Sequence, residues 1–361
     1  MTVDPGLASW LQLTLTPGLG ATTVRNLLER FGLPENVLAA PREQLQSIAG
    51  PAAAALLREE RSEAVARALR WAEEPGHTLI TLADSTYPKL LLEIPDPPVV
   101  LYAAGRLELL GRPALAVVGS RNATVQGVRD AEQFAKAFSE AGLTIVSGLA
   151  LGIDAAAHRG GLSAQGSTIA VLGTGIDVVY PRQNAALAAR IAESGLLLSE
   201  FALGTPGAAH HFPRRNRLIS GLAQGCLVIE AALASGSLIT ARAAAEQGRE
   251  VFALPGSIHS PLSKGGHALI KQGAKLVESA DDVLSELNAF RRTAFASTRT
   301  PAPEAGDAST LLSHMGFDPV DLDSLSVRAG LPVEQVSAEL LRLELAGRVA
   351  ALPGGRYQRL S

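Results

Sequence analysis

The chain has 361 residues, of which 47% are hydrophobic and only 4% aromatic, and its formal net charge is −3. This length allows two or three domains, and the apolar content excludes global disorder. The negative net charge excludes nucleic-acid binding through overall charge, so such binding would need a local basic patch. The single cysteine, Cys226, excludes an internal disulfide and a cysteine-based zinc site, and its strand-like surroundings indicate a buried thiol.

The N-terminus is polar by Asp4 and Pro5 and does not have the pattern of a signal peptide. No uninterrupted apolar run approaches the ~20 residues that are needed to span a bilayer. These observations predict a cytoplasmic protein with no membrane partner.

Residues 1–76 are predicted to form an all-helical domain. Apolar residues recur at helical spacing on both sides of the turn Thr16-Pro-Gly-Leu-Gly20, and a second glycine-containing turn lies at residues 48–51. Helices joined in this way resemble a helix-hairpin-helix element, whose glycine N–H groups can hold a DNA phosphate. The alternative, which we prefer, is a tight turn without a ligand, because only Arg25 and Arg30 follow the first turn closely.

Residues 78–105 combine short strand-like runs with prolines at positions 88, 95, 97 and 98. Because proline cannot donate to a sheet ladder, an edge strand or a loop is expected here rather than a central strand. This segment is expected to strap the helical domain onto the sheet that follows.

Short apolar runs then alternate with helical patterns over a domain predicted at residues 77–290. The expected strands are 114–118, 143–147, 168–172, 196–199, 226–230, 250–254 and 275–278. The expected helices are 124–141, 153–164, 184–194, 215–223, 237–248 and 265–273. Strict alternation predicts an α/β fold, with an extended Rossmann-like parallel sheet and helices on both of its faces.

The C-terminal part is predicted to be a separate module. Residues 291–307 lose periodicity and gain Pro, Ser and Thr, which is typical of a flexible linker. Residues 308–361 contain three helical runs followed by a hairpin, which predicts a winged-helix domain. Its third helix carries Glu334, Glu339 and Glu344 against Arg342 alone, so a protein-contact or regulatory role is favoured over reading duplex DNA.

Small residues follow the first two strands of the predicted sheet, where each strand ends. Ligands of parallel sheets bind at the carboxyl ends of strands, small residues there let a ligand approach the backbone, and free N–H groups at helix starts attract anions. The sequence therefore predicts a phosphate-type anion site, built from Gly119, Ser120, Arg121, Ser147, Gly148 and Gly152.

The strongest basic cluster is the run Arg214-Arg215-Asn216-Arg217 at a helix start. Cations at a helix N-terminus are unfavourable, because this end of the helix dipole is already positive, unless an anion binds among them. The forked donors of a guanidinium group match the oxygens of a phosphate. A solvated charged helix face is the alternative.

Two further segments are candidates for contact with a nucleic acid. Tyr180 could stack on a base or pack over the sheet edge, and the nearby Arg182 could hold a phosphate. The hydroxyl of Ser237 could bind a phosphate or cap the helix that begins there.

Other candidate chemistry is not supported. Asp154 and His158, at positions i and i+4, could form a catalytic pair, but a structural contact is preferred. His210 and His211 have no further ligands at metal-binding spacing. The sequence contains neither a P-loop nor a G-x-S-x-G motif, and Val178 replaces the third glycine of a dinucleotide fingerprint. No catalytic residue, metal or cofactor is therefore predicted.

Many motifs, in order and over most of the chain, resemble the DprA/Smf family of DNA-processing proteins. They begin with Tyr87-Pro88 and include Val118-Gly-Ser-Arg121, Ser147-Gly-Leu-Ala-x-Gly-Ile-Asp154, Gly173-Thr-Gly-Ile-Asp177, Phe212-Pro-x-Arg-Asn-Arg217, Ser235-Gly-Ser-Leu-Ile-Thr-Ala241 and Pro255-Gly-Ser257. The resemblance implies a SAM-like helical domain, a core that binds single-stranded DNA, and a winged-helix tail. It also implies a homodimer that protects transforming DNA and hands it to the RecA recombinase. The family's dimer surface lies late in the core, which indicates Leu269 and Ile270 here.

The predicted mechanism is noncovalent, with phosphates held by Arg121, Arg182, Arg215 and Arg217 and affinity that falls steeply with salt. The alternative is an enzyme of the phosphoribohydrolase type. Its P-G-G-x-G-T-x-x-E pattern is not matched by the nearest analogue here, Ser235-Gly-Ser-Leu-Ile-Thr240. A third possibility is an adaptor for recombinase loading whose contacts with DNA are incidental.

Overall fold

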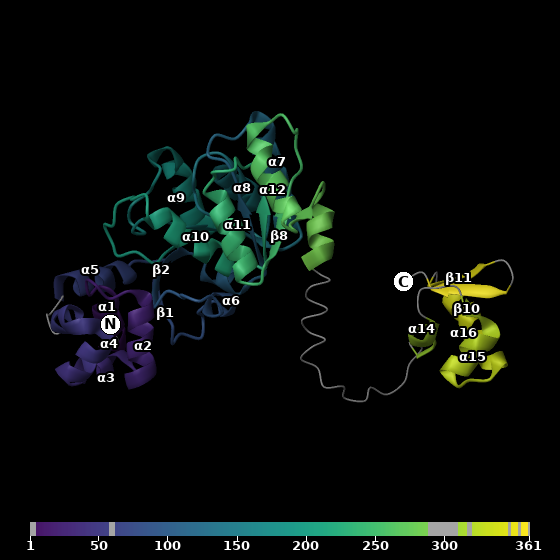
Figure 1. The fold of residues 1–361 in the computed structure, drawn as a ribbon, viewed down its shortest axis with the longest axis horizontal. Helices are drawn as coiled ribbons and strands as arrows, with labels where there is room; N and C mark the ends of the chain where they lie inside the picture. The colour runs from purple at the N-terminus through teal and green to yellow at the C-terminus, as the bar shows by residue number, and fades with distance from the viewer. Residues whose placement is uncertain are drawn as a thin grey trace. The chain divides into compact units, whose positions relative to one another are not determined.

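The computed structural model describes residues 5–57, 62–287, 310–315, 320–345, 348–352 and 355–359. The chain divides into two compact units, Met1–Thr293 and Ala294–Ser361 (Figure 1). The predicted linker, residues 291–307, lies outside the described residues, and the division of the first unit at residue 76 stays a prediction. None of the described helices is long and apolar enough to cross a membrane.

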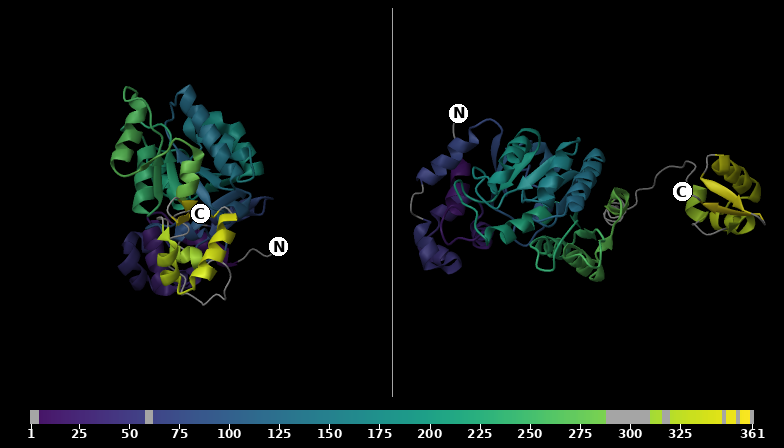
Figure 2. Two further views of the ribbon diagram at one scale, coloured as in Figure 1. Left: turned by 90° about the vertical axis from the view of Figure 1, so that its right-hand side faces the viewer. Right: turned by 90° about the horizontal axis from the view of Figure 1, so that it is seen from above.

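Five helices form the N-terminal part of the first unit: α1 (Pro5–Thr14), α2 (Ala21–Phe31), α3 (Pro34–Ala39), α4 (Arg42–Leu56) and α5 (Ser62–Ala72). The turn between α1 and α2 passes through Gly18 at a φ of 80°, a conformation that favours glycine. The second predicted turn is a kink inside α4 at Gly50, which precedes Pro51. The helices share one apolar core with Leu79 and Tyr102 of the sheet, so they cover one end of it (Figures 1 and 2).

A nine-stranded sheet forms the centre of the first unit. Its order is β1-β2-β6-β5-β4-β3-β7-β8-β9. The strands are β1 (His77–Thr81), β2 (Val100–Gly105), β3 (Ala114–Val118), β4 (Thr144–Ser147), β5 (Thr168–Val171), β6 (Leu196–Ser199), β7 (Gly225–Val228), β8 (Glu250–Ala253) and β9 (Lys275–Leu276). All pairs from β6 to β9 are parallel. The predicted extended Rossmann-like parallel sheet is confirmed.

The strand β2 corrects one expectation. It pairs with both β1 and β6, antiparallel in each case, so it is an inner strand and β1 is the edge. The prolines that argued for an edge or a loop all precede the strand, so no ladder hydrogen bond is lost. They form a connection that Tyr87 fixes by donating its hydroxyl to the carbonyl oxygen of Pro98, at 2.7 Å.

Helices cover both faces of the sheet, and strands β3 to β7 are therefore buried on both sides. On β3, Leu115 and Val117 face the core shared with α7 (Val125–Glu140) and α8 (Ile153–Leu162). Residues 114, 116 and 118 face the core shared with α10 (His211–Gly221), α11 (Ser237–Glu246) and α12 (Lys264–Lys271). The remaining helices of this unit include α6 (Lys89–Leu92) and α9 (Ala185–Ser194).

The strand order reverses at β3, which lies between β4 and β7. Chain leaving the carboxyl end of β3 continues into α7, whereas chain leaving β7 continues into α11 on the opposite face. Such a switch point opens a crevice outside the strand ends, and ligands of open α/β sheets bind in that crevice.

The two residues proposed for the dimer surface do not lie as expected. Leu269 is only 7% exposed and belongs to the core between α12 and the sheet. Ile270 is half-buried and packs against the same core. Both side chains therefore hold α12 in place, because the apolar face of this short helix is turned toward β8 and not toward solvent.

The second unit has the predicted winged-helix architecture. Its elements are α14 (Thr310–Met315), β10 (Val320–Asp321), α15 (Leu322–Ala329), α16 (Val333–Leu345), β11 (Val349–Leu352) and β12 (Arg356–Arg359). The strands form a sheet in the order β10-β12-β11. Asp321 caps α15 by accepting the N–H of Ser324 at 2.8 Å, and Gly330 ends the helix in the left-handed conformation.

Candidate nucleic-acid interface

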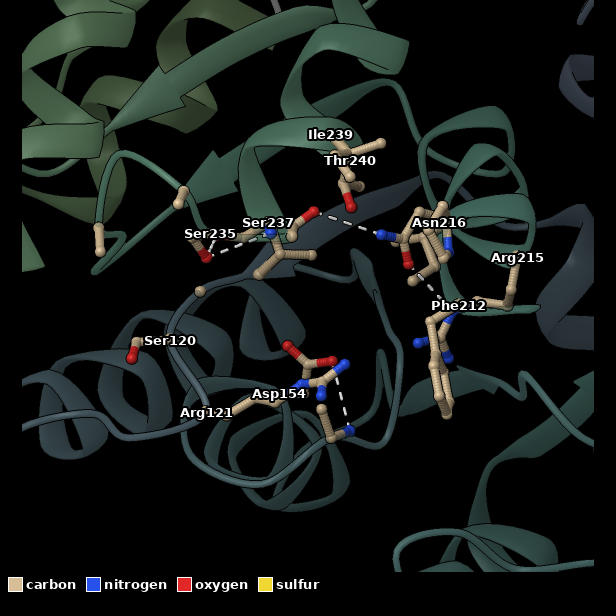
Figure 3. A pocket seen from close by; sticks show the side chains of 18 of the residues that line it. Ser120, Arg121, Asp154, Phe212, Arg215, Asn216, Ser235, Ser237, Ile239 and Thr240 are labelled. Atoms are coloured by element: carbon tan, nitrogen blue, oxygen red, sulfur yellow. Dashed lines mark hydrogen bonds between the residues drawn. The ribbon is translucent and has the colours of Figure 1, made fainter. Parts of the chain in front are cut away.

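A cleft of about 730 Å³ lies at the carboxyl ends of β3 and β7, at the switch point of the sheet. Its walls come from the loop after β3, from α10 with the loop before it, and from the segment that leads into α11 (Figure 3). The predicted site residues that line it are Gly119, Ser120, Arg121, Arg215, Asn216 and Ser237. Tyr180, predicted to stack on a base or to pack over the sheet edge, also lines it.

Two arginines and two aromatic rings meet on one side of the cleft. The guanidinium carbon of Arg121 lies 5.4 Å from the ring centroid of Phe212, and that of Arg215 lies 6.0 Å from the same centroid. The Tyr180 ring is 5.4 Å from Phe212 and is 49% exposed. The ring stabilises both cations, and the cations make this wall attractive to an anion.

Arg215 is a buried cation whose position is fixed. It is only 4% exposed. Its Nη1 donates to the carbonyl oxygens of Gly148, at 2.7 Å, and Val171, and its Nε donates to Asn216 Oδ1 at 3.1 Å. Burial lowers the pKa of Arg215 to about 10, with Arg121 acting in the same direction and Asp154 opposing it. The side chain therefore stays protonated at neutral pH and brings a preorganised charge to the cleft.

The opposite wall is the beginning of α11. The hydroxyls of Ser235 and Ser237 lie 2.6 Å apart, and the Ser237 N–H donates to Ser235 Oγ. Ser237 is thus the first helical residue and not the cap that one interpretation expected. Asn216 Nδ2 donates across the cleft to the Gly236 carbonyl at 3.4 Å, and Ile239 is 41% exposed beside it. Hydroxyls, a helix N-terminus and an apolar side chain therefore face the arginine wall.

The loop after β4 differs from the prediction. The N–H groups of Gly148 and Ala150 donate to Asp154 Oδ2, at 3.1 and 3.4 Å, and the Leu149 N–H donates to His158 Nε2 at 3.2 Å. Side chains of α8 thus occupy the amides that were expected to bind an anion. Asp154 and His158 have the structural role that was preferred for them, although each contacts the loop.

Neither Ser147, Gly148 nor Gly152 lines the cleft. Ser147 Oγ donates to the Val117 carbonyl, so its hydroxyl holds β4 against β3. A Cβ on Gly148 would lie 2.6 Å from Arg215 Nη2, and one on Gly152, at a φ of 75°, would lie 2.3 Å from the Ser120 carbonyl oxygen. These glycines are needed for close packing beneath the cleft and not for contact with a ligand.

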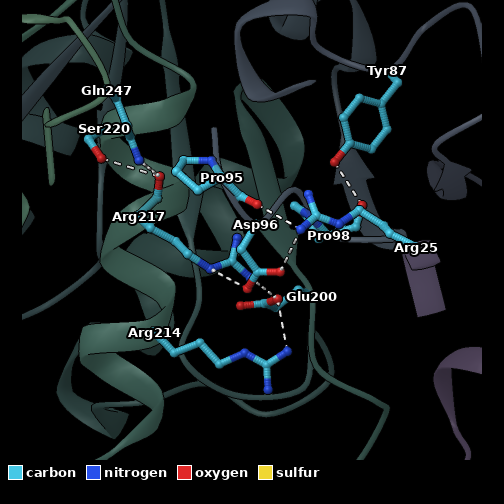
Figure 4. A network of polar contacts seen from close by, with 10 residues as sticks. All are labelled: Arg25, Tyr87, Pro95, Asp96, Pro98, Glu200, Arg214, Arg217, Ser220 and Gln247. Carbon is cyan, nitrogen blue, oxygen red and sulfur yellow. Dashed lines mark hydrogen bonds and ion pairs between the residues drawn. The ribbon is translucent and has the colours of Figure 1, made fainter. Parts of the chain in front are cut away.

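The basic cluster of α10 is divided between two faces of the helix. Arg214 and Arg217, three residues apart, lie on one side and pair with Glu200, at 3.2 and 2.5 Å to its Oε2 (Figure 4). Arg215 is rotated by about 100° from Arg214 and reaches the cleft. Arg214 and Arg217 are not among the residues that line the cleft, so their predicted contact with the ligand stays a prediction. Arg182 is exposed at the start of a short 3₁₀ helix (Arg182–Asn184) and does not line the cleft either.

Phe212 is the residue that the sequence interpretation missed as a site residue. Its ring joins the two arginines, and Gly173 leaves room for it, since a Cβ there would lie 2.8 Å from the ring. The available signals were a phenylalanine immediately before the basic cluster and a glycine immediately after a strand.

The cleft has the chemistry of an anion site. Asp154 is the only carboxylate among the residues that line it. Burial raises the pKa of Asp154, with Arg215 opposing, and its Oδ2 already accepts two loop N–H groups. Within the described residues no three His, Cys, Asp or Glu side chains gather as a metal site. The donors that remain are guanidinium, amide and hydroxyl groups.

The sequence and the fold of this chain are similar to those of known proteins. Residues 78–288 match the family model of DNA recombination-mediator protein A, and residues 295–355 match the DprA winged helix domain. Protein Smf of Escherichia coli (strain K12) is 46% identical over 311 residues, which are 82% of this chain and 81% of that protein.

Two solved structures are similar in fold. The X-ray structure of DNA processing protein A from Streptococcus pneumoniae has a TM-score of 0.70 and 41% identity, over 77% of this chain and 97% of that one. DNA processing protein A from Helicobacter pylori, described for its single-stranded DNA binding mode, has a TM-score of 0.53 and 30% identity, over 60% of this chain and 96% of that one. With its sheet, its winged helix and its sequence all in agreement, the chain belongs to the DprA/Smf family of DNA-processing proteins.

Proposed function

We propose that this protein binds single-stranded DNA, with its phosphates in the cleft at the switch point of the sheet. The observation that carries the proposal is the pair of arginines, Arg121 and Arg215, held over one phenylalanine ring beside a helix N-terminus. Guanidinium groups bind phosphate oxygens strongly, and exposed Tyr180 offers a ring for a base. The single-stranded DNA binding ascribed to the Helicobacter pylori relative supports the same assignment.

The wider role that we propose is to protect incoming single strands during natural transformation and to load RecA onto them, as a cytoplasmic homodimer. The family's description as a recombination mediator supports this role. We propose that binding is not coupled to catalysis, since the one carboxylate of the cleft is engaged by the loop after β4. The phosphoribohydrolase alternative needs a free carboxylate at such a site.

Fluorescence anisotropy with a labelled oligothymidylate, over a series of salt concentrations, tests the proposal. The wild-type logarithm of affinity should fall linearly with the logarithm of salt, by about 0.7 for each neutralised phosphate. Arg121→Ala and Arg215→Ala should each weaken binding and reduce this slope. Arg190→Ala, which removes one exposed charge from α9 away from the cleft, is the matched control.

Three outcomes would count against the proposal: no binding by the wild type, a flat salt dependence, or equal losses in all three variants. Release of free base from a nucleoside monophosphate by the purified protein would favour the enzyme alternative instead.

A further inference from the structure

One carboxylate holds the face of α10 that points away from the cleft. The side chain of Glu200, directly after β6, is only 2% exposed. Its Oε2 lies 2.5 Å from Arg217 Nη2 and 3.2 Å from Arg214 Nη2 (Figure 4). Its Oε1 makes no hydrogen bond within the described residues, so among these residues the two guanidinium groups are the partners of this buried carboxylate.

The residue after Glu200 contacts the same end of the helix. The Phe201 ring lies 4.5 Å from the ring of His211, and the guanidinium carbon of Arg214 lies 5.4 Å from the Phe201 centroid. The segment that leaves β6 therefore holds the first two turns of α10 through two ion pairs and through ring contacts.

Those same two turns carry the cleft residues. Phe212, Arg215 and Asn216 alternate along the helix with the anchored Arg214 and Arg217. Because a helix rotates as one body, a change of its rotation on the Glu200 face moves Arg215 and Asn216 on the other. A small rotation of α10 matters here, because the Arg215 guanidinium lies tightly against Gly148 and has little free space in which to adjust.

We propose that Glu200 is a positioning residue for the single-stranded DNA cleft. By pairing with Arg214 and Arg217 it sets the rotation of α10, and through α10 it places Arg215 and Asn216 against the ligand. This inference rests on the proposed function of the cleft. It assigns a role to the two arginines of the basic cluster that do not reach the cleft.

The ion pairs of α10 continue through Asp96 to Arg25 of the N-terminal helices, but these further pairs are longer. Arg217 Nε lies 3.6 Å from Asp96 Oδ2, and Arg25 of α2 lies 3.9 Å from Asp96 Oδ1. Asp96 is more exposed than Glu200, and its pairs are longer. A substitution of Asp96 is therefore expected to have a smaller effect than one of Glu200.

The proposal and simple electrostatics predict changes of opposite sign. Glu200→Gln removes a negative charge from the vicinity of a basic cleft, which by charge alone would strengthen DNA binding. If Glu200 positions α10, the same substitution weakens DNA binding, because the two arginines lose their anchor. The sign of the change separates the two explanations.

The test is oligothymidylate anisotropy at fixed salt with wild type, Glu200→Gln and Glu193→Gln. Glu193 is exposed on α9, so its substitution removes the same charge without disturbing α10. We expect about tenfold weaker binding for Glu200→Gln, within the usual range of coupled contacts, and no weakening for Glu193→Gln. In an Arg215→Ala background, Glu200→Gln should cause a clearly smaller loss, because the part of its effect that acts through Arg215 is already gone and only the part through Asn216 remains.

Unchanged or tighter binding by Glu200→Gln, or an equal loss in the Arg215→Ala background, would overturn the proposal. Glu200→Asp, which keeps the charge but shortens its reach, is the second variant and should also weaken binding. Hydrogen exchange gives a readout without DNA: amides of residues 211–217 should exchange faster in Glu200→Gln than in Glu193→Gln. Failure of the wild type to bind would instead refute the function proposed for the cleft.

Discussion

Leu149 donates its backbone N–H to Nε2 of His158 across 3.2 Å, and it does so from a left-handed conformation with a φ of 57°. On the other side of the ring, Nδ1 lies 2.7 Å from Thr168 Oγ1, which itself donates to the Ile145 carbonyl. The ring must therefore donate from Nδ1 and accept at Nε2, which only the neutral imidazole can do. Burial lowers the pKa of His158 to about 3, and Arg215 and Arg159 act in the same direction.

This pKa predicts a loss of stability in mild acid. Below its ordinary pKa of 6.5 the unfolded chain binds a proton at His158, whereas the folded chain does not until about pH 3. Stability therefore falls as pH falls through this interval, by about 2 kcal/mol between pH 7 and pH 5. His158→Gln should lose this part of the pH dependence. Urea unfolding at both pH values measures it.

The difference in pH dependence between wild type and His158→Gln reports on His158 alone, because Asp154 is present in both proteins. Burial raises the pKa of Asp154, which makes its own contribution to stability fall as pH rises through the raised pKa. An equal pH dependence in wild type and His158→Gln would mean that the folded protein protonates the ring.

A second prediction concerns the packing of Gly148 under Arg215. In Gly148→Ala the new methyl group would lie 2.6 Å from Nη2, so the guanidinium has to move. We expect oligothymidylate affinity to fall about tenfold, the value of one hydrogen bond to a charged group. Gly111→Ala is the control, since nothing lies within 4 Å of its added methyl. Equal affinities of the two variants would argue against a fixed Arg215.

A third prediction tests whether Leu269 packs in the core of its own chain or at a surface between two copies of the chain. Because Leu269 is buried in the core of its own chain, Leu269→Ala should lower the free energy of unfolding by roughly 2–4 kcal/mol. The loss should be the same at low and high protein concentration. A loss that appears only at concentrations where the wild type associates would return Leu269 to the dimer surface.

A fourth prediction concerns the winged helix. All residues that line the cleft belong to the first unit, and α16 presents Glu334 and Glu344 with a single arginine. A chain that ends at Thr293 should therefore bind oligothymidylate with wild-type affinity and salt dependence. A clear drop in affinity would indicate that the second unit contacts DNA, and Arg356 and Arg359 of β12 would then be the first residues to substitute.

The sheet was predictable because its signal is local. Strands β3 to β7 are short apolar runs buried on both faces, and β3 and β4 are followed directly by small residues and then by a helix. Gly119-Ser-Arg121 could be assigned to the site for a related reason, since strand ends of a parallel sheet lie on one edge. Asn216 was assigned with the basic cluster at the start of a helix.

The direction of each arginine was not predictable. It depends on which partner the side chain contacts in the folded protein, and Glu200, the partner of Arg214, lies 14 residues before it in the sequence. Nor does a glycine-rich loop reveal whether its amides are free. Asp154 and His158 reach back to the loop before them and accept the N–H groups that the prediction had left for a ligand.

The N–H groups of the loop after β4 already donate to Asp154 and His158, and this has a consequence for how the cleft would hold a DNA strand. Backbone amides form a rigid array, and a phosphate chain bound to such an array has one register. Here the arginine, asparagine and serine donors of the cleft stand on side chains, with the N-terminus of α11 beside them, so a strand that advances by one nucleotide can meet a similar set of contacts. We therefore expect the protein to retain a strand without fixing its position along the cleft.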